Sequence, residues 1–205
     1  TQAMFMSQRY TIPQISTGDI LRKEISRGSQ IGNEAQAYIS QGLLVPDEIV
    51  VQLVRNRICE NDCQEGYILD GFPRTVPQAK AMQTNDIDVN YIVLIDAKDE
   101  VILERLSGRR VCSSCNRMYH VQLNAPKTPG ICDDCAITLT KRKVDEIETI
   151  KKSIIVFRDQ TAPLIEFYQS AENVEFFNVD GGSTEEETPE VIFGRITKLL
   201  DGEIS

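Results

Sequence analysis

The sequence predicts an α/β protein with helices on both faces of a parallel sheet, a three-layer sandwich. Short apolar runs alternate with helical patterns along the chain, which is the arrangement that parallel sheets require. The clearest run is Asn-Tyr-Ile-Val-Leu-Ile-Asp at residues 90–96, which we expect to be a buried strand. Tyr67, Ile68 and Leu69 form another such strand, followed by a helical pattern from Val76. A chain of 205 residues suits one domain with insertions.

Start and stop signals divide the chain into its elements. Ser16 and Asp19 have capping-box spacing, which predicts a helix that Gly28 ends. Pro189 is placed near the first turn of the last helix. The expected strands cover residues 12–15, 67–69, 90–96 and 175–179, and the expected helices cover residues 1–10, 17–27, 31–41, 47–58, 76–84, 99–106, 146–168 and 189–200.

Composition excludes several classes of protein. Hydrophobic residues make up 41% of the chain and charged residues 26%, without an apolar run of membrane-spanning length or a signal-peptide pattern. We therefore expect a cytoplasmic protein with no membrane partner. We also expect a monomer. The net charge of −9 argues against nucleic acid as a partner, and anionic ligands would need local arginine clusters.

The loop after residues 67–69 carries side chains that suit a phosphorylated purine. Asp70 could hold magnesium through water, and Gly71 lets backbone approach a ligand closely. The Arg74 guanidinium can bind phosphate through two donors, and the Gln78 amide can match a base edge. In open α/β sheets, ligands bind at the carboxyl ends of strands, where this loop lies. A strand-to-helix turn with a surface arginine fits the same stretch equally well.

Six cysteines occur in the chain, and four have the spacing C-x2-C-x16-C-x2-C. Cys112, Cys115, Cys132 and Cys135 predict a structural Zn²⁺ site, because two such pairs close a tetrahedral thiolate set. With that set complete, we expect the single histidine, His120, to be packed or solvent-facing rather than a ligand. Cys59 and Cys63 are interpreted as structural thiols.

Residues 66–78, the Thr-Gln-Ala opening and the cysteine segment together resemble adenylate kinases of the bacterial type with a zinc-binding lid, over almost the whole chain. The resemblance implies a fold like that of the P-loop nucleoside monophosphate kinases, with two small insertions. It implies reversible phosphoryl transfer from Mg-ATP to AMP, giving two ADP, with Mg²⁺ accompanying ATP. The implied domains are a core of residues 1–15, 46–108 and 146–205, an AMP-binding insertion at 16–45, and a zinc-binding lid at 109–145.

The same resemblance implies roles for individual residues. The AMP site would comprise Thr17, Arg22, Leu43, Leu44, Val45, Gly71, Phe72, Pro73, Arg74, Gln78 and Arg142. The ATP site would comprise Thr1, Arg105, Arg109, Met118 and Tyr119. The catalytic group would be Arg74, Arg109 and Arg142, which clamp phosphates, with Asp70 ordering magnesium-bound water. Without the resemblance, Thr17 could simply cap a helix, and Arg105 and Arg109 could be surface cations.

The chain departs from the family pattern in three ways. A first strand and a glycine-rich phosphate loop precede the Thr-Gln-Ala opening in the family, and we expect the natural chain to carry them. Val144 stands where an acid is usual, and Ser153 stands where a second arginine is usual. These departures leave open an alternative, a catalytically impaired or inactive nucleotide-binding relative. An acceptor base other than adenine also stays open.

Overall fold

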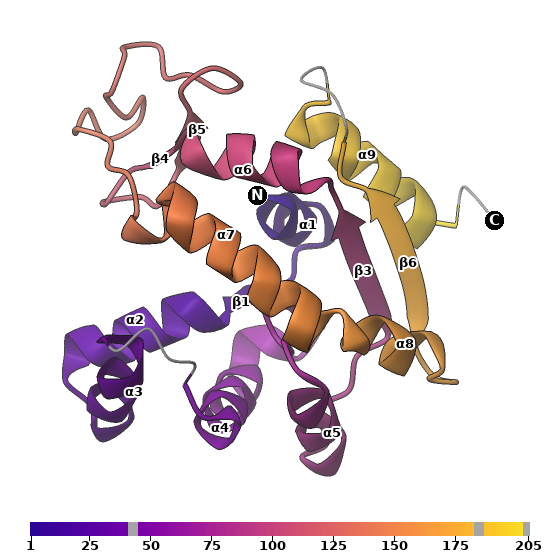
Figure 1. Ribbon diagram of the computed structural model, residues 1–205. Helices are drawn as coiled ribbons and strands as arrows, with labels where there is room; N and C mark the ends of the chain where they lie inside the picture. Colours follow the sequence, from indigo (N-terminus) through magenta and orange to yellow (C-terminus); the bar gives the residue numbers. More distant parts are fainter. Residues whose placement is uncertain (41–44, 183–186, 203–205) are drawn as a thin grey trace. The chain divides into compact units, whose positions relative to one another are not determined.

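The computed structural model describes residues 1–40, 45–182 and 187–202 (Figure 1). The chain forms two compact units, which are considered one at a time. One unit contains Gln2–Tyr91 and Gln160–Glu175 and is named the β1–β2 unit after its paired strands, β1 (Gln14–Ser16) and β2 (Ile68–Asp70). The other contains Thr1, Ile92–Asp159 and Phe176–Ser205 and is named the β3–β6 unit after β3 (Tyr91–Asp96) and β6 (Glu175–Asp180). Each unit combines a pair of strands with several helices, so the predicted α/β class is confirmed.

The β1–β2 unit is built on two short parallel strands. Strand β1 (Gln14–Ser16) pairs with β2 (Ile68–Asp70), and Ile15 stands opposite Leu69. Helix α1 (Gln2–Tyr10) packs against both strands. The parallel pairing was predicted, but β2 begins one residue later than expected and is half-buried rather than buried. Its last residue, Asp70, is exposed at the carboxyl end of the strand, where the loop of residues 71–75 begins.

Local signals predicted the ends of the helices in this unit well. Ser16 Oγ accepts a hydrogen bond from Asp19 N, and Gly28 adopts a left-handed conformation with φ of 65°. The Thr75 side chain caps the next helix by accepting from Gln78 N. The helices are α2 (Thr17–Arg27), α3 (Gln30–Ser40), α4 (Asp47–Ile58), α5 (Val76–Thr84) and α8 (Pro163–Gln169), with a 3-10 turn, η1, at Asn61–Cys63.

A glycine allows two of these helices to pack closely. A Cβ atom on Gly32 of α3 would lie 2.2 Å from the carbonyl oxygen of Glu24 in α2. The α2–α3 pair therefore depends on the missing side chain. The main apolar core of the unit lies beside it and contains Ala35, Val45, Val50, Val51, Val54, Phe72, Met82 and Ile87.

The β3–β6 unit contains the longer strands, β3 (Tyr91–Asp96) and β6 (Glu175–Asp180), which pair and point the same way in Figure 1. The prediction that β3 is buried was wrong: the side chains of Tyr91 and Ile95 are 52% and 39% exposed. Among the described strands, β3 pairs with β6 alone, so it lies in a two-stranded pair that keeps an open edge. The helices of this unit are α6 (Asp99–Ser107), α7 (Ile147–Val156) and α9 (Pro189–Leu200).

The helix predicted over residues 146–168 is interrupted. A π-helical segment, η3 (Phe157–Thr161), separates α7 from α8. Pro163 begins α8 and has no N–H to donate to the carbonyl four residues earlier, which explains why regular α-helix does not continue through this point. None of the described helices combines the length and apolar character needed to cross a bilayer.

The cysteine segment belongs to the β3–β6 unit. Strands β4 (Arg109–Val111) and β5 (Met118–His120) pair in antiparallel fashion, so Arg110 faces Tyr119. Val111 also forms a bridge with Thr140, which returns the chain to β4. A 3-10 turn, η2 (Lys143–Asp145), then leads into α7. This small sheet brings the two halves of the cysteine motif together.

Candidate functional site

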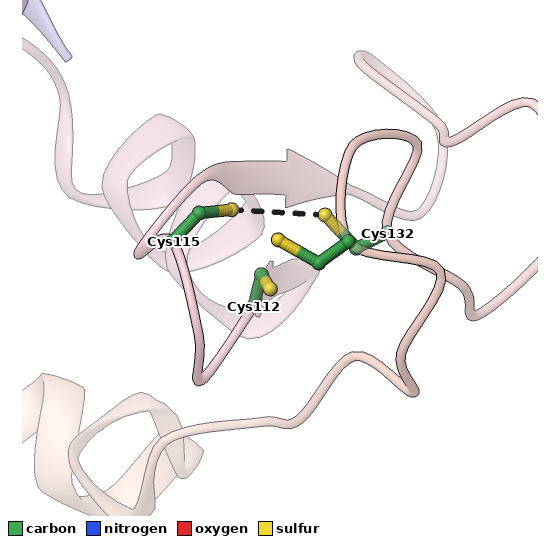
Figure 2. Close-up of side chains that lie close together, drawn as sticks. Cys112, Cys115 and Cys132 are labelled. Atoms are coloured by element: carbon green, nitrogen blue, oxygen red, sulfur yellow. Dashed lines mark hydrogen bonds between the residues drawn. The ribbon is translucent and has the colours of Figure 1, made fainter.

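The four cysteines of the motif form one cluster, as their spacing predicted. Their sulfur atoms all lie within 4.8 Å of one another, and none is in a disulfide. Figure 2 shows Cys112, Cys115 and Cys132 directing their sulfurs toward a common point, with 3.7 Å between the Sγ atoms of Cys115 and Cys132. Four thiols this close together could hold a metal ion, and four thiolates are a set that binds Zn²⁺ tetrahedrally.

The two cysteine pairs have the same backbone geometry. Asn116 N donates to Cys112 O at 3.0 Å, and Ala136 N donates to Cys132 O at 2.9 Å. Both of these residues, each directly after a second cysteine, have positive φ angles, 59° and 54°. The first cysteine of each pair also donates a backbone hydrogen bond, from Cys112 N to Arg117 O at 3.0 Å and from Cys132 N to Ile137 O at 2.8 Å. Backbone hydrogen bonds within each turn thus hold each cysteine pair in the same local geometry.

Tyr119 contacts the cluster from β5. Its side chain is 3% exposed, and its hydroxyl lies 3.5 Å from Cys132 Sγ while accepting a hydrogen bond from Asp133 N at 2.9 Å. This contact lowers the pKa of the Cys132 thiol to about 6, and desolvation raises the pKa of Tyr119 to about 12.

An exposed ion pair joins the two halves of the segment. The Arg117 guanidinium bonds both carboxylate oxygens of Asp134 at 2.6 Å and lies over the Tyr119 ring at 5.3 Å. His120 is buried and lies outside the cluster. Its Nδ1 accepts from the N–H groups of Gln122 and Leu123, and its Nε2 lies 3.3 Å from Glu104 O. The expectation that His120 is packed rather than a ligand agrees with these contacts.

Two arginines expected to bind ATP phosphates have partners within the β3–β6 unit. Arg105 donates to the backbone carbonyl of Gly181. Arg109 donates from Nε to Asp145 Oδ2 at 3.0 Å and from Nη2 to Asp145 Oδ1. Arg142 is half-buried. Of the other residues expected at the ATP site, Met118 is half-buried, Tyr119 is buried against Cys132, and Thr1 is exposed.

In the β1–β2 unit, two side chains near the loop of residues 71–75 donate to the same acceptor, the carbonyl oxygen of Gly71. Gly71, with φ of 75°, offers its carbonyl oxygen to Arg74 Nε at 2.8 Å and to Thr17 Oγ1 at 3.3 Å. Asp70 accepts from Gln14 Nε2 at 2.7 Å and is exposed. The structure therefore brings Thr17, Gly71 and Arg74 together, with Asp70 directly before them in the chain.

Gln78 is held by two partners in the same loop region. Its Oε1 accepts from Arg74 N at 2.7 Å, and its Nε2 donates to Asp47 Oδ1 at 2.6 Å. The other oxygen of Asp47 accepts from Thr75 Oγ1 at 3.3 Å. The sequence did not indicate that Asp47 contacts Gln78. Asp47 lies in the first turn of α4, where an acidic residue is common because it interacts favourably with the helix dipole.

The remaining residues expected at the AMP site have varied positions. Arg22 is exposed and forms an ion pair with Asp19, three residues earlier on α2. Val45 and Phe72 are buried in the core of the unit, and Pro73 is half-buried. Leu43 and Leu44 lie outside the described residues.

Comparison with known proteins decides the family. The family model described as adenylate kinase matches residues 1–173. The chain belongs to the adenylate kinase family. It is 45% identical over 204 residues to the adenylate kinase of Clostridium botulinum strain Alaska E43, covering 98% of this chain and 92% of the relative. It is 47% identical over 174 residues to that of Caldicellulosiruptor saccharolyticus, covering 83% of this chain and 81% of the relative.

Membership of the adenylate kinase family confirms two predictions, the P-loop kinase-like α/β fold and the class of enzyme. It also fits the geometry, because the loop with Gly71 and Arg74 follows a parallel strand, and ligands in such folds bind at the carboxyl ends of strands. The cysteine cluster could hold a metal ion, as in the zinc-bearing members that the sequence resembles.

Proposed function

We propose that this chain catalyses reversible phosphoryl transfer between Mg-ATP and AMP, giving two molecules of ADP. The observation that carries the proposal is the adenylate kinase match over residues 1–173, which spans both units. Such a reaction needs positioned cations more than a covalent residue. Residues 16–45 would bind AMP, residues 109–145 would form the lid, and residues 1–15, 46–108 and 146–205 would form the core.

On the AMP side, Arg74 would bind the AMP phosphate, which accepts the transferred phosphoryl group. Its Nε is bonded to Gly71 O, so the guanidinium is oriented by the loop while both terminal nitrogens keep donors for a ligand. Thr161 Oγ1 donates to the Arg74 carbonyl and steadies the same residue from η3. Gln78 would face the base. The other proposed AMP contacts are Thr17, Arg22, Leu43, Leu44, Val45, Gly71, Phe72, Pro73 and Arg142.

On the ATP side, Arg109 would face the phosphates, with Arg105, Arg142, Thr1, Met118 and Tyr119 as further contacts. The bond to Asp145 uses Nε and one hydrogen of Nη2 of Arg109. The opposite edge of the guanidinium still presents a pair of donors, which matches a phosphate. Asp70, exposed at the end of β2, would order a water bound to the Mg²⁺ of Mg-ATP.

The cysteine cluster would hold a structural Zn²⁺. All four positions of a tetrahedral site would be filled by Cys112, Cys115, Cys132 and Cys135, which leaves none for a substrate. The metal would therefore stabilise the lid and take no part in chemistry. We also propose that the enzyme is a cytoplasmic monomer.

Substitution of Arg74 tests this function. Arg74→Ala should lower the rate of ADP formation from ATP and AMP by about 100-fold or more, because a fixed cation at the accepting phosphate is lost. Arg55→Ala is the matched control, since Arg55 is exposed in the same unit and bonds only weakly to Asn85 at 3.5 Å. Equal turnover in the two variants would remove Arg74 from the mechanism. Absence of ADP formation by the unsubstituted protein would favour the inactive nucleotide-binding alternative.

A further inference from the structure

The side-chain amide of Gln78 is held at both ends by groups of opposite character. Its oxygen accepts from the backbone N–H of Arg74 at 2.7 Å, and its nitrogen donates to the Asp47 carboxylate at 2.6 Å. A carboxylate can only accept, and a backbone N–H can only donate. The two partners therefore determine which end of the amide is oxygen and which is nitrogen.

Reversing this amide would be costly. A 180° rotation would turn its oxygen toward the Asp47 carboxylate and its NH2 group toward the Arg74 N–H, so both hydrogen bonds would be replaced by repulsive contacts. Gln78 is 6% exposed, so water cannot compensate for the lost bonds. The partners are themselves restrained: Asp47 also accepts from Thr75 Oγ1, and Thr75 caps α5.

The fixed orientation has a consequence for base recognition. After its two internal bonds, the amide keeps one acceptor site on oxygen and one N–H for a ligand. Adenine complements that pair, because its amino group donates and its N1 accepts. Hypoxanthine and guanine carry the opposite pair at the same positions, a carbonyl that accepts and an N1–H that donates. Only a reversed amide would fit them.

We propose that Asp47, together with the Arg74 N–H, makes this kinase selective for adenine by locking the Gln78 amide in one orientation. Asp47 is a positioning residue, since it acts through Gln78. The proposal rests on the proposed function, in which Gln78 faces the base of the acceptor nucleotide. A glutamine amide could in principle recognise adenine or, after rotation, hypoxanthine and guanine. The proposal explains why Gln78 would recognise adenine alone.

The fixed orientation of the Gln78 amide is called the lock below. A series of nucleotides tests it in the unsubstituted protein. The probes are AMP, purine riboside monophosphate, which lacks the amino group, and IMP, which has hypoxanthine. Purine keeps the N1 acceptor and loses only one bond, whereas IMP meets a locked amide with two mismatched groups. We expect binding, measured by calorimetry without ATP, to weaken from AMP to purine riboside monophosphate to IMP. IMP binding as tightly as purine riboside monophosphate would overturn the lock, because a free amide would simply rotate.

Asp47→Asn tests the role of the carboxylate. An asparagine can donate or accept, so one of the two restraints on the Gln78 amide disappears. The ratio of kcat/KM for AMP to that for IMP should fall by about tenfold, with IMP use rising in absolute terms. Glu48→Gln is the control, because it removes the same charge from the adjacent, exposed residue of α4. Asp47→Glu, which keeps the acceptor, should retain much of the preference for AMP.

The outcomes separate the lock from the proposed function. A purely structural role for Asp47 would lower kcat/KM for both nucleotides equally, and the unchanged ratio would overturn the proposal. If the unsubstituted enzyme fails to form ADP from ATP and AMP, the proposed function fails before the lock is tested. If it forms ADP and the Asp47→Asn ratio is unchanged, the lock alone fails. If Asp47→Asn does not fold, the nucleotide series still tests the fixed amide, and retained AMP preference in Asp47→Glu tests the role of the carboxylate.

Discussion

Asp145 is buried completely and accepts two hydrogen bonds from Arg109, a residue 36 positions earlier in the chain. The contact joins the start of β4 to the turn η2, so it closes the base of the cysteine segment. An arginine proposed to bind ATP is thereby oriented by a carboxylate that water cannot reach.

Removing the charge of Asp145 should therefore destabilise the protein. Asp145→Asn leaves a guanidinium that is only 24% exposed without its counter-ion. We expect the free energy of unfolding, measured by urea denaturation, to fall by about 3 kcal/mol. Asp134→Asn is the matched control, because the Arg117–Asp134 pair is exposed on both sides, and it should cost less than about 1 kcal/mol. Equal losses in the two variants would contradict a special role for the buried pair.

Ser153 offers a test of catalytic charge. Its hydroxyl bonds to the carbonyl of Thr149, four residues earlier on α7, and its side chain is exposed. Ser153→Arg should raise the rate of ADP formation by about tenfold, because it adds a cation where the family usually has one. Ser153→Ala removes the same hydroxyl without adding charge and should leave the rate unchanged. An unaltered rate in Ser153→Arg would mean that another cation already supplies the charge.

Gly108 and His120 are in close contact. A Cβ atom on Gly108 would lie 2.0 Å from His120 Nε2, and the ring is held on its other side by two backbone N–H groups. Gly108→Ala should lower the free energy of unfolding by about 1–3 kcal/mol, because the ring must shift. The melting temperature provides a convenient measure.

Two controls isolate this contact. Gly194 lies inside α9, and an added Cβ would meet nothing within 4 Å, so Gly194→Ala should stabilise the protein by about 0.5–1 kcal/mol. In a His120→Ala background, Gly108→Ala should lose most of its cost. Destabilisation that persists there would place the effect elsewhere in the turn.

Metal removal tests the cysteine cluster. The protein is expected to bind one zinc ion per chain, and a chelator should lower its melting temperature, because metal binding energy contributes to folding of the lid. Cys115→Ser should abolish zinc binding and make the melting temperature insensitive to the chelator. Cys59→Ser removes an exposed thiol outside the cluster and should change neither property. Full zinc content in Cys115→Ser, measured by native mass spectrometry, would contradict a four-thiolate site.

Asp62 makes the free energy of unfolding depend on pH. Arg57 donates to its two oxygens at 2.8 and 2.7 Å, and these bonds hold the pKa of Asp62 below its usual 3.8 in the folded protein. A carboxyl group whose pKa is lower in the folded than in the unfolded protein stabilises the fold at pH values above the unfolded-state pKa. This stabilisation is lost as the pH falls through the folded-state pKa. The unfolding free energy of the wild type should therefore exceed that of Asp62→Asn near neutral pH, and the gap should close below about pH 4. In an Arg57→Met background, Asp62→Asn should show no such pH dependence.

Features that depend on residues close together in the chain could be predicted from the sequence. The cap at Ser16 and the left-handed end at Gly28 depend on groups within one helical turn, so they occur where predicted. The cysteine pairs were predictable for the same reason, since each closes its own backbone turn and the spacing already contains the ligand set. The family pattern of residues 66–78 likewise indicated the enzyme class, which the adenylate kinase match confirmed.

Contacts between distant residues were decided by the tertiary structure alone. Asp145 and Arg109, or Asp47 and Gln78, stand 36 and 31 positions apart, and each side chain by itself resembles an ordinary surface or helix-cap residue. Nothing in their local sequence indicates a partner, because such a contact forms only when separate elements pack together. The sequence thus predicted the α/β class, the caps at Ser16 and Gly28 and the cysteine cluster, and folding decided how Arg109 and Gln78 are held.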